Sequence, residues 1–470
     1  MPALLCAFPG REVGQLNRIA GRAKALFLLS CLLLGGFGFF IAEYCLKGSA
    51  WAIFSGSPHV YYAGNIGTGV VIDRDNILLL DMNGGREYSV DADLRKATMH
   101  WLGDRQGNIS APALGSHSQA IAGFDVLNGL YSYGQIGAVE QLTLSADVQK
   151  AALEALGNKK GTIAVYNYKT GELLCAVTTP TYDPDHVPDI ANDISGTYEG
   201  AYLNRFTQVS YTPGSIFKVV TAGAVLESEP ALAEEYFVCT GSHKIGVDVI
   251  TCERAHGAQN LKAAFLNSCN CVFAQISQRL GGEQLAYCAN AFRVNQSVSF
   301  DGIITAKGNY EASSEPVNVA WSAVGQYKNL VNPCVYLTFI GAVANGGTPV
   351  QPYVVQKITV GGEVTYQAKA ATLAPVMSAQ TAQILQEYMR NNVANKYGDG
   401  NFGGLTVCAK TGTAEVGEHQ RPNAMFCGFV QDEGYPLAFI ACVEDGGYGG
   451  QVCIPMVSKV LAACKAVLDS

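Results

Sequence analysis

The sequence has few charged residues and no long run of one sign. Asp, Glu, Lys and Arg make up 15% of its 470 residues, and the formal net charge is −8. Nucleic-acid binding depends on a basic surface that neutralises phosphates, so this composition argues against a nucleic-acid partner. Low-complexity tracts and repeats at solenoid periods are also lacking, which argues against a repeat architecture. The length instead allows two or three globular domains, each with its own hydrophobic core.

One long apolar run is present, and it lies near the N-terminus. Residues 25–42 contain no charged side chain and reach the lower edge of the length that crosses a bilayer. Arginines and a lysine precede this run, which places residues 1–24 in the cytoplasm and the later chain outside. We therefore expect a retained, single-pass transmembrane anchor over residues 25–44. A buried core helix and a signal peptide cleaved near Ala50-Trp51-Ala52 are the alternatives.

Cysteine is common, with fifteen in the chain. Most of those from Cys175 onward stand singly in apolar runs, where a small buried hydrophobic side chain explains them. Cys239 and Cys252 differ, because they flank a polar, glycine-containing loop that is typical of a hairpin. We expect a disulfide between these two cysteines.

The chain after the anchor divides into two expected domains. Residues 45–140 alternate short apolar runs with turns, as in a strand, turn and strand over residues 70–80, and predict a small β-rich pedestal. Residues 141–470 have strands near both ends and helices between them, which predicts an α+β domain with helices covering an antiparallel sheet. The expected elements of this domain are a helix after Ser145 to Leu156, strands 161–167 and 173–177, helices 215–226, 261–280, 336–343 and 378–394, strands 405–413, 425–430 and 437–443, and a helix 456–468.

Three short patterns follow one another in this second domain. They are Ser215-x-x-Lys218, Ser268-x-Asn270 and Lys410-Thr411-Gly412. The second pattern lies among apolar residues, where buried hydroxyl and amide groups need partners. Packing against backbone would explain it alone, but its position between the other two patterns favours one shared site.

The residues around Ser215 favour a nucleophilic serine. Thr212-Pro213-Gly214 should break the chain, so that a helix N-terminus favours negative charge on Ser215 Oγ. Lys218 lies one helical turn further on among apolar neighbours, which disfavour its charged form, and Lys410 would disfavour it further. A neutral Lys218 can take the serine proton. An N-cap serine followed by an ordinary exposed lysine is the alternative interpretation.

The tripeptide Lys-Thr-Gly occurs twice, and its context separates the two copies. Residues 169–171 lie between two short strands, which predicts a hairpin turn. Residues 410–412 continue an apolar strand that begins at Leu405, and a strand can hold them along the rim of a cleft. We therefore expect the first copy to be structural and the second to belong to the site.

The three patterns resemble the active site of penicillin-binding transpeptidases and serine β-lactamases. The surrounding sequence narrows the resemblance to monofunctional, class B penicillin-binding proteins. The segments that carry it are Tyr211-Thr-Pro-Gly-Ser-Ile-Phe-Lys218, Leu203-Asn204-Arg205, Lys169-Thr170-Gly171-Glu172, Ala344-Asn345-Gly346-Gly347, Ile72-Asp73-Arg74 and Gly103-Asp104-Arg105. A glycosyltransferase domain has no room before residue 141, so the bifunctional class is not expected. Cys269 stands where β-lactamases often carry Asp, which disfavours that class.

The resemblance implies an anchor, a pedestal and a transpeptidase domain with a five-stranded sheet and a helical subdomain. It implies that Ser215, deprotonated by Lys218, attacks the penultimate D-alanine carbonyl, and that Ser268 passes a proton to the leaving D-alanine. The backbone N–H groups of Ser215 and Thr413 would form the oxyanion hole. The residues expected to bind substrate are Asn270, Lys410, Thr411, Gly412 and Thr413. No metal or cofactor is implied.

The expected activity is cross-linking of peptidoglycan stem peptides outside the bacterial plasma membrane, with β-lactams as inhibitors. A polytopic glycan polymerase in the membrane is the expected partner, because no polymerising domain is expected in this chain. One alternative is a hydrolase of the D,D-carboxypeptidase or β-lactamase type. The other is a sensor or scaffold that is acylated by β-lactams without turnover.

Overall fold

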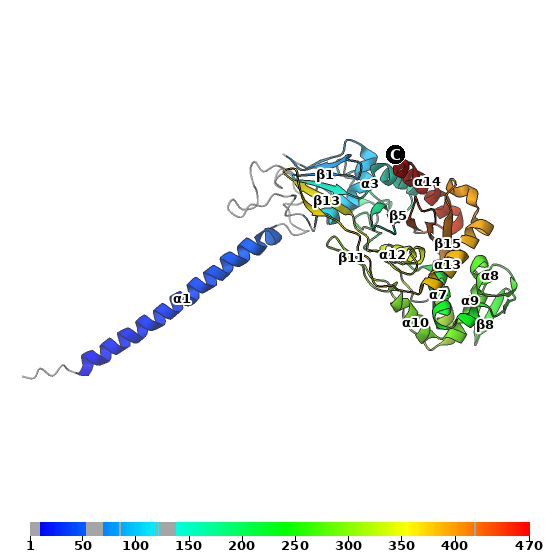
Figure 1. Cartoon of the computed structure of the whole chain (residues 1–470), viewed down its shortest axis with the longest axis horizontal. Coiled ribbons are helices and arrows are strands. Elements are labelled where there is room, and N and C mark those ends of the chain that lie inside the picture. Colours follow the sequence, from blue (N-terminus) through cyan, green and yellow to red (C-terminus); the bar gives the residue numbers. More distant parts are fainter. Residues whose placement is uncertain are drawn as a thin grey trace, which may run out of the picture.

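The computed structural model describes residues 10–52, 69–83, 86–115, 117, 121, 138–417 and 420–470. Figure 1 shows a long N-terminal helix and a folded body that contains two separate sheets with helices around them. The glycine-rich stretch over residues 123–137 lies outside the described residues.

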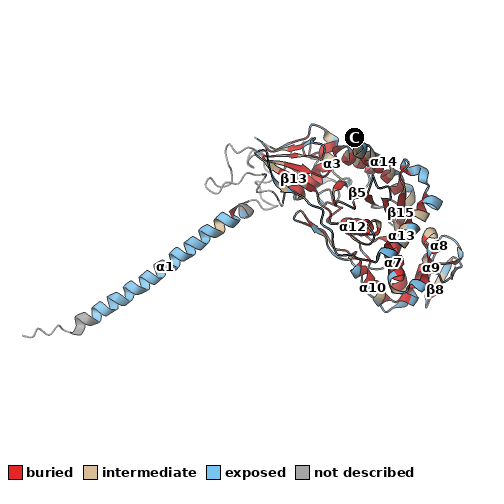
Figure 2. Cartoon of the chain, viewed as in Figure 1, coloured by how far each residue is buried: buried red, intermediate tan, exposed pale blue. Residues whose placement is uncertain are grey.

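Helix α1, Gly10–Ala52, carries the apolar run. Its segment Gly14–Gly48 is long and apolar enough to cross a membrane, and its most apolar stretch is not buried against the rest of the chain (Figure 2). Large hydrophobic side chains such as Phe27, Leu33 and Phe37 are exposed along it. A core helix would bury such side chains, so their exposure is typical of a membrane anchor rather than of a core element.

A six-stranded sheet in the order β14-β13-β4-β1-β2-β3 forms the pedestal. Its strands are β1 (Gly69–Ile72), β2 (Leu78–Asp81), β3 (Glu87–Tyr88), β4 (Ala138–Leu142), β13 (Val355–Val360) and β14 (Glu363–Gln367). The strand, turn and strand predicted over residues 70–80 are confirmed as the antiparallel pair β1 and β2. Strands β13 and β14 come from the segment that the sequence division assigned to the second domain. Strand β13 pairs with β4, more than two hundred positions away in sequence, and β14 pairs with β13, so no local pattern could have placed them here.

Helix α3, Ala92–Leu102, joins the pedestal to the second domain. Arg95 on this helix donates to both carboxylate oxygens of Asp183, at 2.7 and 2.6 Å. Asp104, in the loop after the helix, accepts a hydrogen bond from the Tyr182 hydroxyl at 2.9 Å. Charge-assisted hydrogen bonds of this kind are the strong ones, and these contacts link α3 and its following loop to the segment after Thr179 in the second domain.

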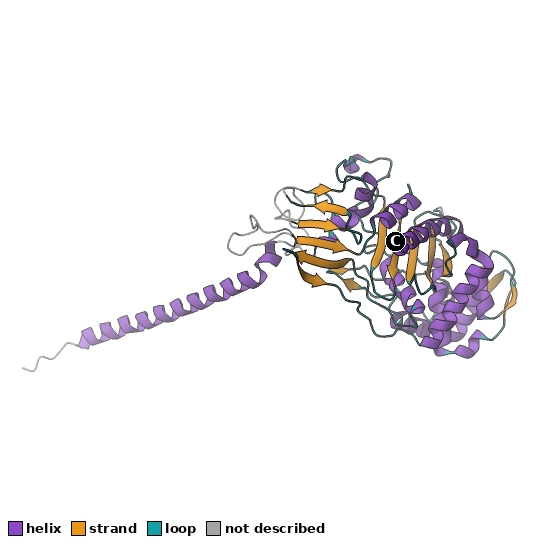
Figure 3. Ribbon diagram, turned by 45° about the horizontal axis from the view of Figure 1, so that its top comes forward, coloured by secondary structure: helices purple, strands orange, loops and turns teal. Residues whose placement is uncertain are grey.

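The second sheet has five antiparallel strands in the order β15-β16-β17-β5-β6, as expected. The strands are β5 (Gly161–Asn167), β6 (Leu173–Thr179), β15 (Val407–Ala414), β16 (Asn423–Val430) and β17 (Leu437–Val443). Every residue of β16 and β17 is buried. Since both faces of these strands are buried, helices must cover both sides of the sheet, and Figure 3 shows helices packed around it.

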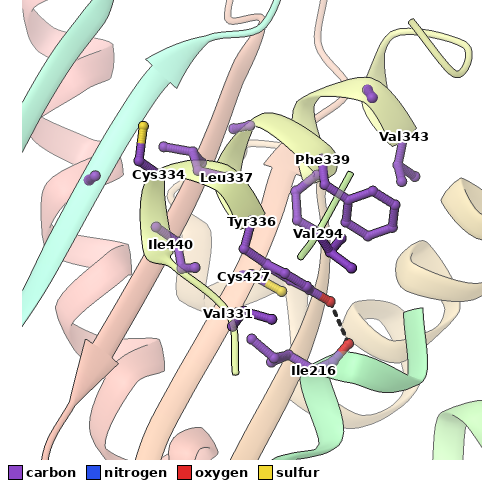
Figure 4. Packing of buried hydrophobic residues seen from close by; sticks show 14 of the residues in the cluster. Ile216, Val294, Val331, Cys334, Tyr336, Leu337, Phe339, Val343, Cys427 and Ile440 are labelled. Carbon is purple, nitrogen blue, oxygen red and sulfur yellow. Dashed lines mark hydrogen bonds between the residues drawn. The ribbon is translucent and has the colours of Figure 1, made fainter. Parts of the chain in front are cut away.

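Helices cover both faces of this sheet. Helices α6 (Ala146–Leu156) and α14 (Gly449–Asp469) pack with Ala441 of β17 on one face, while α12 (Pro333–Ala344) packs with Ile440 on the other. Helix α14 begins at Gly449, seven residues earlier than the predicted start at residue 456. On α12, the Tyr336 hydroxyl donates to Ile216 O at 2.7 Å (Figure 4), which fixes the segment that carries Ser215.

The N-terminus of α6 is capped by a residue of the pedestal. Ser145 occupies the N-cap position but its side chain makes no capping hydrogen bond. Asp73, after β1, instead accepts from Ala146 N at 2.9 Å through Oδ2. A carboxylate at a helix N-terminus also complements the helix dipole, so the motif around Asp73 ties the pedestal to the second domain.

The remaining helices form a helical subdomain beside the five-stranded sheet. These helices are α7 (Lys218–Ser228), α8 (Leu261–Asn267), α9 (Asn270–Leu280), α10 (Gly282–Ala291), α11 (Pro316–Ala323) and α13 (Ala379–Asn392). Ser378 caps α13 as predicted, accepting from Thr381 N at 3.2 Å. The prediction of one helix over residues 261–280 is wrong. Helix α8 ends at its C-cap, Ser268, which adopts a left-handed conformation with φ of 52°, and α9 begins at Asn270.

The short elements lie mostly in connections. The strands are β7 (Phe237–Cys239), β8 (Ser242–Ile245), β9 (Asp248–Thr251), β10 (Gly257–Gln259), β11 (Ser299–Phe300) and β12 (Ile303–Ile304). The short helices are α4 (Pro112–Gly115), η1 (Ile190–Asn192), η2 (Gly214–Phe217), η3 (Pro230–Ala233), η4 (Val393–Tyr397) and η5 (Asp399–Phe402). Strands β8 and β9 pair antiparallel and confirm the hairpin predicted after Cys239.

Candidate active site

Ser215 lies in the tight turn η2, which leads directly into α7. The helix predicted from Ser215 is thus present, with a 3₁₀ first turn. Gly214 has a φ of 52°, and a Cβ at this position would lie 2.5 Å from Thr413 O. Only glycine tolerates both that backbone conformation and that close approach, so Gly214 lets the serine turn pack directly against β15.

Lys218 is fully buried and its Nζ contacts the polar side chains of the first two motifs. Nζ lies 3.1 Å from Ser215 Oγ, 3.2 Å from Ser268 Oγ and 2.7 Å from Asn270 Oδ1. It also donates to Ser268 O at 2.7 Å. Burial lowers the pKa of Lys218 to about 7, although nearby cysteine sulfurs oppose this shift. A large fraction of the amine is therefore neutral near pH 7 and can accept a proton from the serine.

Lys410 of β15 reaches the same region from the sheet and is also fully buried. Its Nζ donates to Ser268 Oγ at 3.1 Å and to Thr411 O at 3.0 Å. Burial, reinforced by the charge of Lys218, holds the pKa of Lys410 well below its ordinary value. A bound carboxylate would oppose both effects, so this position favours an anionic ligand.

The break between α8 and α9 brings the second motif to Lys218. In a continuous helix, residues two positions apart point in different directions, so Ser268 and Asn270 could not both face one amine. The left-handed Ser268 ends α8, and Asn270 begins α9. Asn270 Nδ2 donates to Thr251 O at 3.0 Å, which leaves its oxygen turned to Lys218.

The third motif lies against the serine turn. A Cβ at Gly412 would lie 2.9 Å from Ile216 Cγ2 and 3.0 Å from Pro213 O, so glycine permits this packing. Thr411 N donates to the Tyr397 hydroxyl at 3.1 Å, and Thr411 Oγ1 lies 2.9 Å from the same oxygen. Sequence reasoning missed Tyr397, because a single tyrosine after a helix carries no recognisable signal.

A partly buried ion pair supports the segment before the serine. Arg205 Nε lies 2.8 Å from Glu444 Oε1, and the Tyr211 hydroxyl donates to the same oxygen at 2.9 Å. Both Arg205 and Tyr211 belong to segments that carry the family resemblance. Glu444, at the end of β17, was missed, since its role depends on the pairing of strands far apart in sequence.

The first Lys-Thr-Gly copy is confirmed as the turn between β5 and β6, the two strands furthest from β15 in the sheet. Asn167 Oδ1 accepts from Lys169 N and Thr170 N, which closes the turn. Gly171 has a φ of 90°, as such a turn requires. Lys169 is exposed and donates to Asn345 Oδ1 at 2.7 Å, so it makes none of the contacts of Lys410.

The expected disulfide is not formed. Cys239 and Cys252 are both free thiols, so the predicted pairing is wrong. Cys252 Sγ instead lies 3.6 Å from Cys269 Sγ, the residue between Ser268 and Asn270. The hairpin between Cys239 and Cys252 was predicted correctly. Both cysteines lie close to Cys269, whose position near them could not be predicted from the sequence.

The anchor-like helix, the pedestal sheet and the three motifs beside a five-stranded antiparallel sheet define a class B penicillin-binding protein. The chain belongs to the penicillin-binding protein transpeptidase domain family, whose model matches residues 161–462. It is 26% identical over 355 residues to the peptidoglycan D,D-transpeptidase PbpA of Mycobacterium tuberculosis, covering 68% of this chain and 71% of that protein. The resemblance inferred from the motifs is confirmed.

Solved structures have the same fold. The D,D-transpeptidase domain of a peptidoglycan glycosyltransferase from Eggerthella lenta matches with a TM-score of 0.72 and 25% identity, covering 85% of this chain and 98% of that one. Penicillin-binding protein A from Mycobacterium tuberculosis, solved as a ceftriaxone acyl-enzyme complex, matches with a TM-score of 0.74 and 20% identity, covering 86% and 99%. These matches place the α+β architecture described above within the penicillin-binding fold.

Proposed function

We propose that this protein is a serine D,D-transpeptidase that cross-links peptidoglycan stem peptides through an acyl-enzyme on Ser215. The observation that carries the proposal is the position of Lys218 Nζ, buried and 3.1 Å from Ser215 Oγ. A weakly basic amine at hydrogen-bonding distance is what a serine hydroxyl needs to become a nucleophile. The relative named a peptidoglycan D,D-transpeptidase supports the choice of reaction.

In the acylation step, neutral Lys218 takes the proton of Ser215 Oγ while the oxygen attacks the carbonyl carbon of the penultimate D-alanine. The oxyanion accepts hydrogen bonds from Ser215 N and Thr413 N. The orientation of Thr413 supports this role, because its carbonyl oxygen faces Gly214 and the N–H of a strand residue points to the same side as its carbonyl. Collapse of the intermediate breaks the peptide bond and leaves an ester on Ser215.

The other motif residues bind the substrate and protonate the leaving group. Ser268 Oγ lies between the two lysine amines and relays the proton that Lys218 took from Ser215 to the departing D-alanine amine, which leaves Lys218 neutral again. Asn270 holds the substrate amide, and Lys410 pairs with the terminal carboxylate, together with the hydroxyls of Thr411 and Thr413. Gly412 keeps this strand close to the serine turn. The amine of a second stem peptide then attacks the ester, forms the cross-link and returns the proton to Ser215.

We further propose that α1 is retained as a single membrane anchor and that the folded domains lie outside the plasma membrane. The exposed apolar length of α1 and the basic residues before it support this topology. A polytopic glycan polymerase is the proposed partner, since cross-linking needs newly made glycan strands.

Labelling with a reporter penicillin tests the nucleophile. Intact-mass and peptide mapping should place one penicilloyl group on Ser215, and Ser215→Ala should lose all labelling while keeping the wild-type unfolding temperature. Ser210→Ala is the matched control and should label normally, because Ser210 is a partly buried serine in the same segment whose hydroxyl donates to Lys307 O. Label on another serine would reject the assignment.

Product analysis separates the transpeptidase from its alternatives. Incubation with polymerised lipid-linked substrate and an acceptor amine should give cross-linked dimers. Release of D-alanine with water as the only acceptor would identify a hydrolase. Penicillin acylation without any turnover of stem peptides would identify a sensor or scaffold.

A further inference from the structure

Four potential metal ligands converge beside the second motif. Cys239, Cys252, His256 and Cys269 each offer one ligand atom, and all four atoms lie within 4.8 Å of one another. Two of the separations are shorter, with 3.6 Å between the sulfurs of Cys252 and Cys269 and 3.6 Å between Cys239 Sγ and His256 Nδ1. The proposed acyl-transfer chemistry uses none of these four side chains.

The ligands come from separate segments, so the cluster is a product of the fold. Cys239 ends β7, and β7 pairs with β10 so that Cys239 lies opposite Gly257, the residue after His256. Cys252 follows β9, and its N–H donates to Gly241 O at 3.0 Å. Cys269 occupies the N-cap position of α9. Two small sheets and one helix terminus thus converge on a single point.

The separations match tetrahedral zinc. Zn–S bonds of about 2.3 Å and Zn–N bonds of about 2.0 Å give ligand separations of roughly 3.5–3.8 Å in a tetrahedron. The two 3.6 Å separations fall in that range, and the other pairs need a contraction of at most about 1 Å to reach it. Three thiolates and one imidazole form a common structural zinc set, and soft sulfur ligands in a tetrahedron select zinc over the hard cations.

The surroundings suit thiolate ligands. The backbone N–H of Cys271 donates to Cys252 Sγ at 3.3 Å, a contact that stabilises a negatively charged sulfur and orients it. Cys239 and Cys269 are buried, whereas Cys252 and His256 are only partly buried, so a metal ion can enter from solvent.

The segment that carries three of the ligands has little core of its own. Over residues 237–259, all of which the structure describes, Ile245 and Ile250 are the only buried aliphatic side chains. Val238, Val247 and Val249 are exposed. A unit this small usually needs a disulfide or a metal to become stable, and its cysteines are free thiols.

We propose that Cys239, Cys252, His256 and Cys269 bind a structural zinc ion that fastens the β7–β10 segment to the start of α9. This site goes beyond the transpeptidase function and supplies no step of it. Because Cys269 separates Ser268 from Asn270, the metal also fixes the backbone that presents both residues to Lys218. The zinc is therefore a positioning element for the catalytic serine–lysine group.

Zinc content tests the site directly. Full-length protein, purified in detergent with its tag removed and without chelator, should contain about one zinc per chain by elemental mass spectrometry. Cys252→Ser and His256→Ala should lose most of this zinc. Cys288→Ser is the matched control, because Cys288 is a buried thiol outside the cluster, and it should keep the wild-type content.

Cobalt substitution makes the test independent of variant folding. Wild-type protein depleted of zinc and loaded with Co²⁺ should show the sulfur-to-metal charge-transfer and intense visible bands of tetrahedral cobalt thiolate. Hydrogen exchange should show faster exchange in β7–β10 and at the start of α9 after depletion, with little change in β13 and β14.

Three results would overturn the proposal. They are wild-type protein that neither contains nor binds zinc, cobalt spectra without thiolate bands, and ligand variants that keep wild-type zinc content. A disulfide between Cys252 and Cys269 in the purified protein would overturn it as well. Penicillin labelling of Ser215 is a separate readout, so failure of the zinc site and failure of the proposed function are distinguishable.

Discussion

Lys410 donates from Nζ to the hydroxyl of Ser268 at 3.1 Å. Lys218 approaches the same oxygen at 3.2 Å, so one hydroxyl lies between two buried amines. Burial lowers the pKa of both amines. The protonation of Lys218 and Lys410 therefore changes with pH at lower pH values than for exposed lysines. The rate of acylation should therefore depend on the protonation states of these two lysines.

The first prediction concerns pH. Lys218 acts as a base only when neutral, and its pKa is about 7, so the second-order rate constant for penicillin acylation should rise as pH increases through about 7. Above that pH Lys218 is already deprotonated and contributes no further increase in the rate constant. Fluorescent-penicillin labelling rates measured from about pH 5 to 9 check this. A profile that is flat or falls across neutrality would contradict the role of Lys218.

The two Lys-Thr-Gly copies should respond oppositely to substitution. Lys410→Ala should raise the free-energy barrier for acylation by about 2–4 kcal/mol, because the ligand carboxylate loses its charged partner. Lys169→Ala, its matched control, should leave acylation unchanged and shift the free energy of unfolding by no more than about 0.5 kcal/mol. Acylation kinetics and chemical denaturation measure the two effects. Similar losses of acylation in both variants would mean that the copies were assigned wrongly.

Gly214 should be sensitive to a single added methyl group. Gly214→Ala would place a Cβ 2.5 Å from Thr413 O, which should push the serine turn away from β15 and slow acylation by about tenfold or more. Gly361→Ala is the control, since Gly361 has a similar φ of 60° and no atom within 4 Å of the added Cβ. Both variants place alanine at a similar positive φ, so the difference between their acylation rates reports on the contact with Thr413. Equal rates would show that the close approach is unimportant.

The anchor should remain on the mature protein. Membrane fractions should contain the chain at full mass, and protease added outside intact spheroplasts should digest the folded domains while sparing the N-terminal residues. The physical reason is the uncharged apolar run over residues 25–42 of α1, which is longer than a signal-peptide core. Secretion of a mature form that begins near residue 50 would instead identify a cleaved signal peptide.

The glycines of the anchor should contribute to the membrane partner. Gly35, Gly36 and Gly38 have nothing within 4 Å of an added Cβ, and small residues permit close helix packing in a bilayer. Replacing all three by Leu should weaken co-purification of a glycan polymerase in detergent and leave penicillin acylation at the wild-type rate. Co-purification that survives this change and replacement of the whole anchor would assign the contact to the pedestal.

Much of the fold could be predicted from local sequence. Buried strands such as β16 and β17 and the turn around Gly171 have strong local patterns, and their positions are confirmed within a few residues. The break at Ser268 could not be predicted, because the apolar spacing continues across it and a left-handed serine has no sequence signature. Tertiary contacts with Lys218 stabilise that conformation, and a local pattern does not contain them.

The sequence predicted those residues of the candidate site that belong to the three motifs, and it missed those that lie outside them. Ser215, Lys218, Ser268 and Lys410 meet as expected. Tyr397 was not found, since its contact with Thr411 depends on how α13 packs beside β15. The cysteine cluster was misinterpreted as one disulfide for the same reason.

Strand β15 lies at the edge of its sheet. This position has a consequence for which substitutions can cause resistance to an inhibitor. A ligand that lies extended along an edge strand binds largely through main-chain groups, which no side-chain substitution removes. Under the proposed function, β-lactams and stem peptides both bind along this strand. Resistance should therefore arise at residues that position the strand, such as Tyr397, or Gly449, where a Cβ would lie 2.2 Å from Gly412 O. Under the proposed function, each such change also displaces the stem peptide, so resistance should come with slower cross-linking.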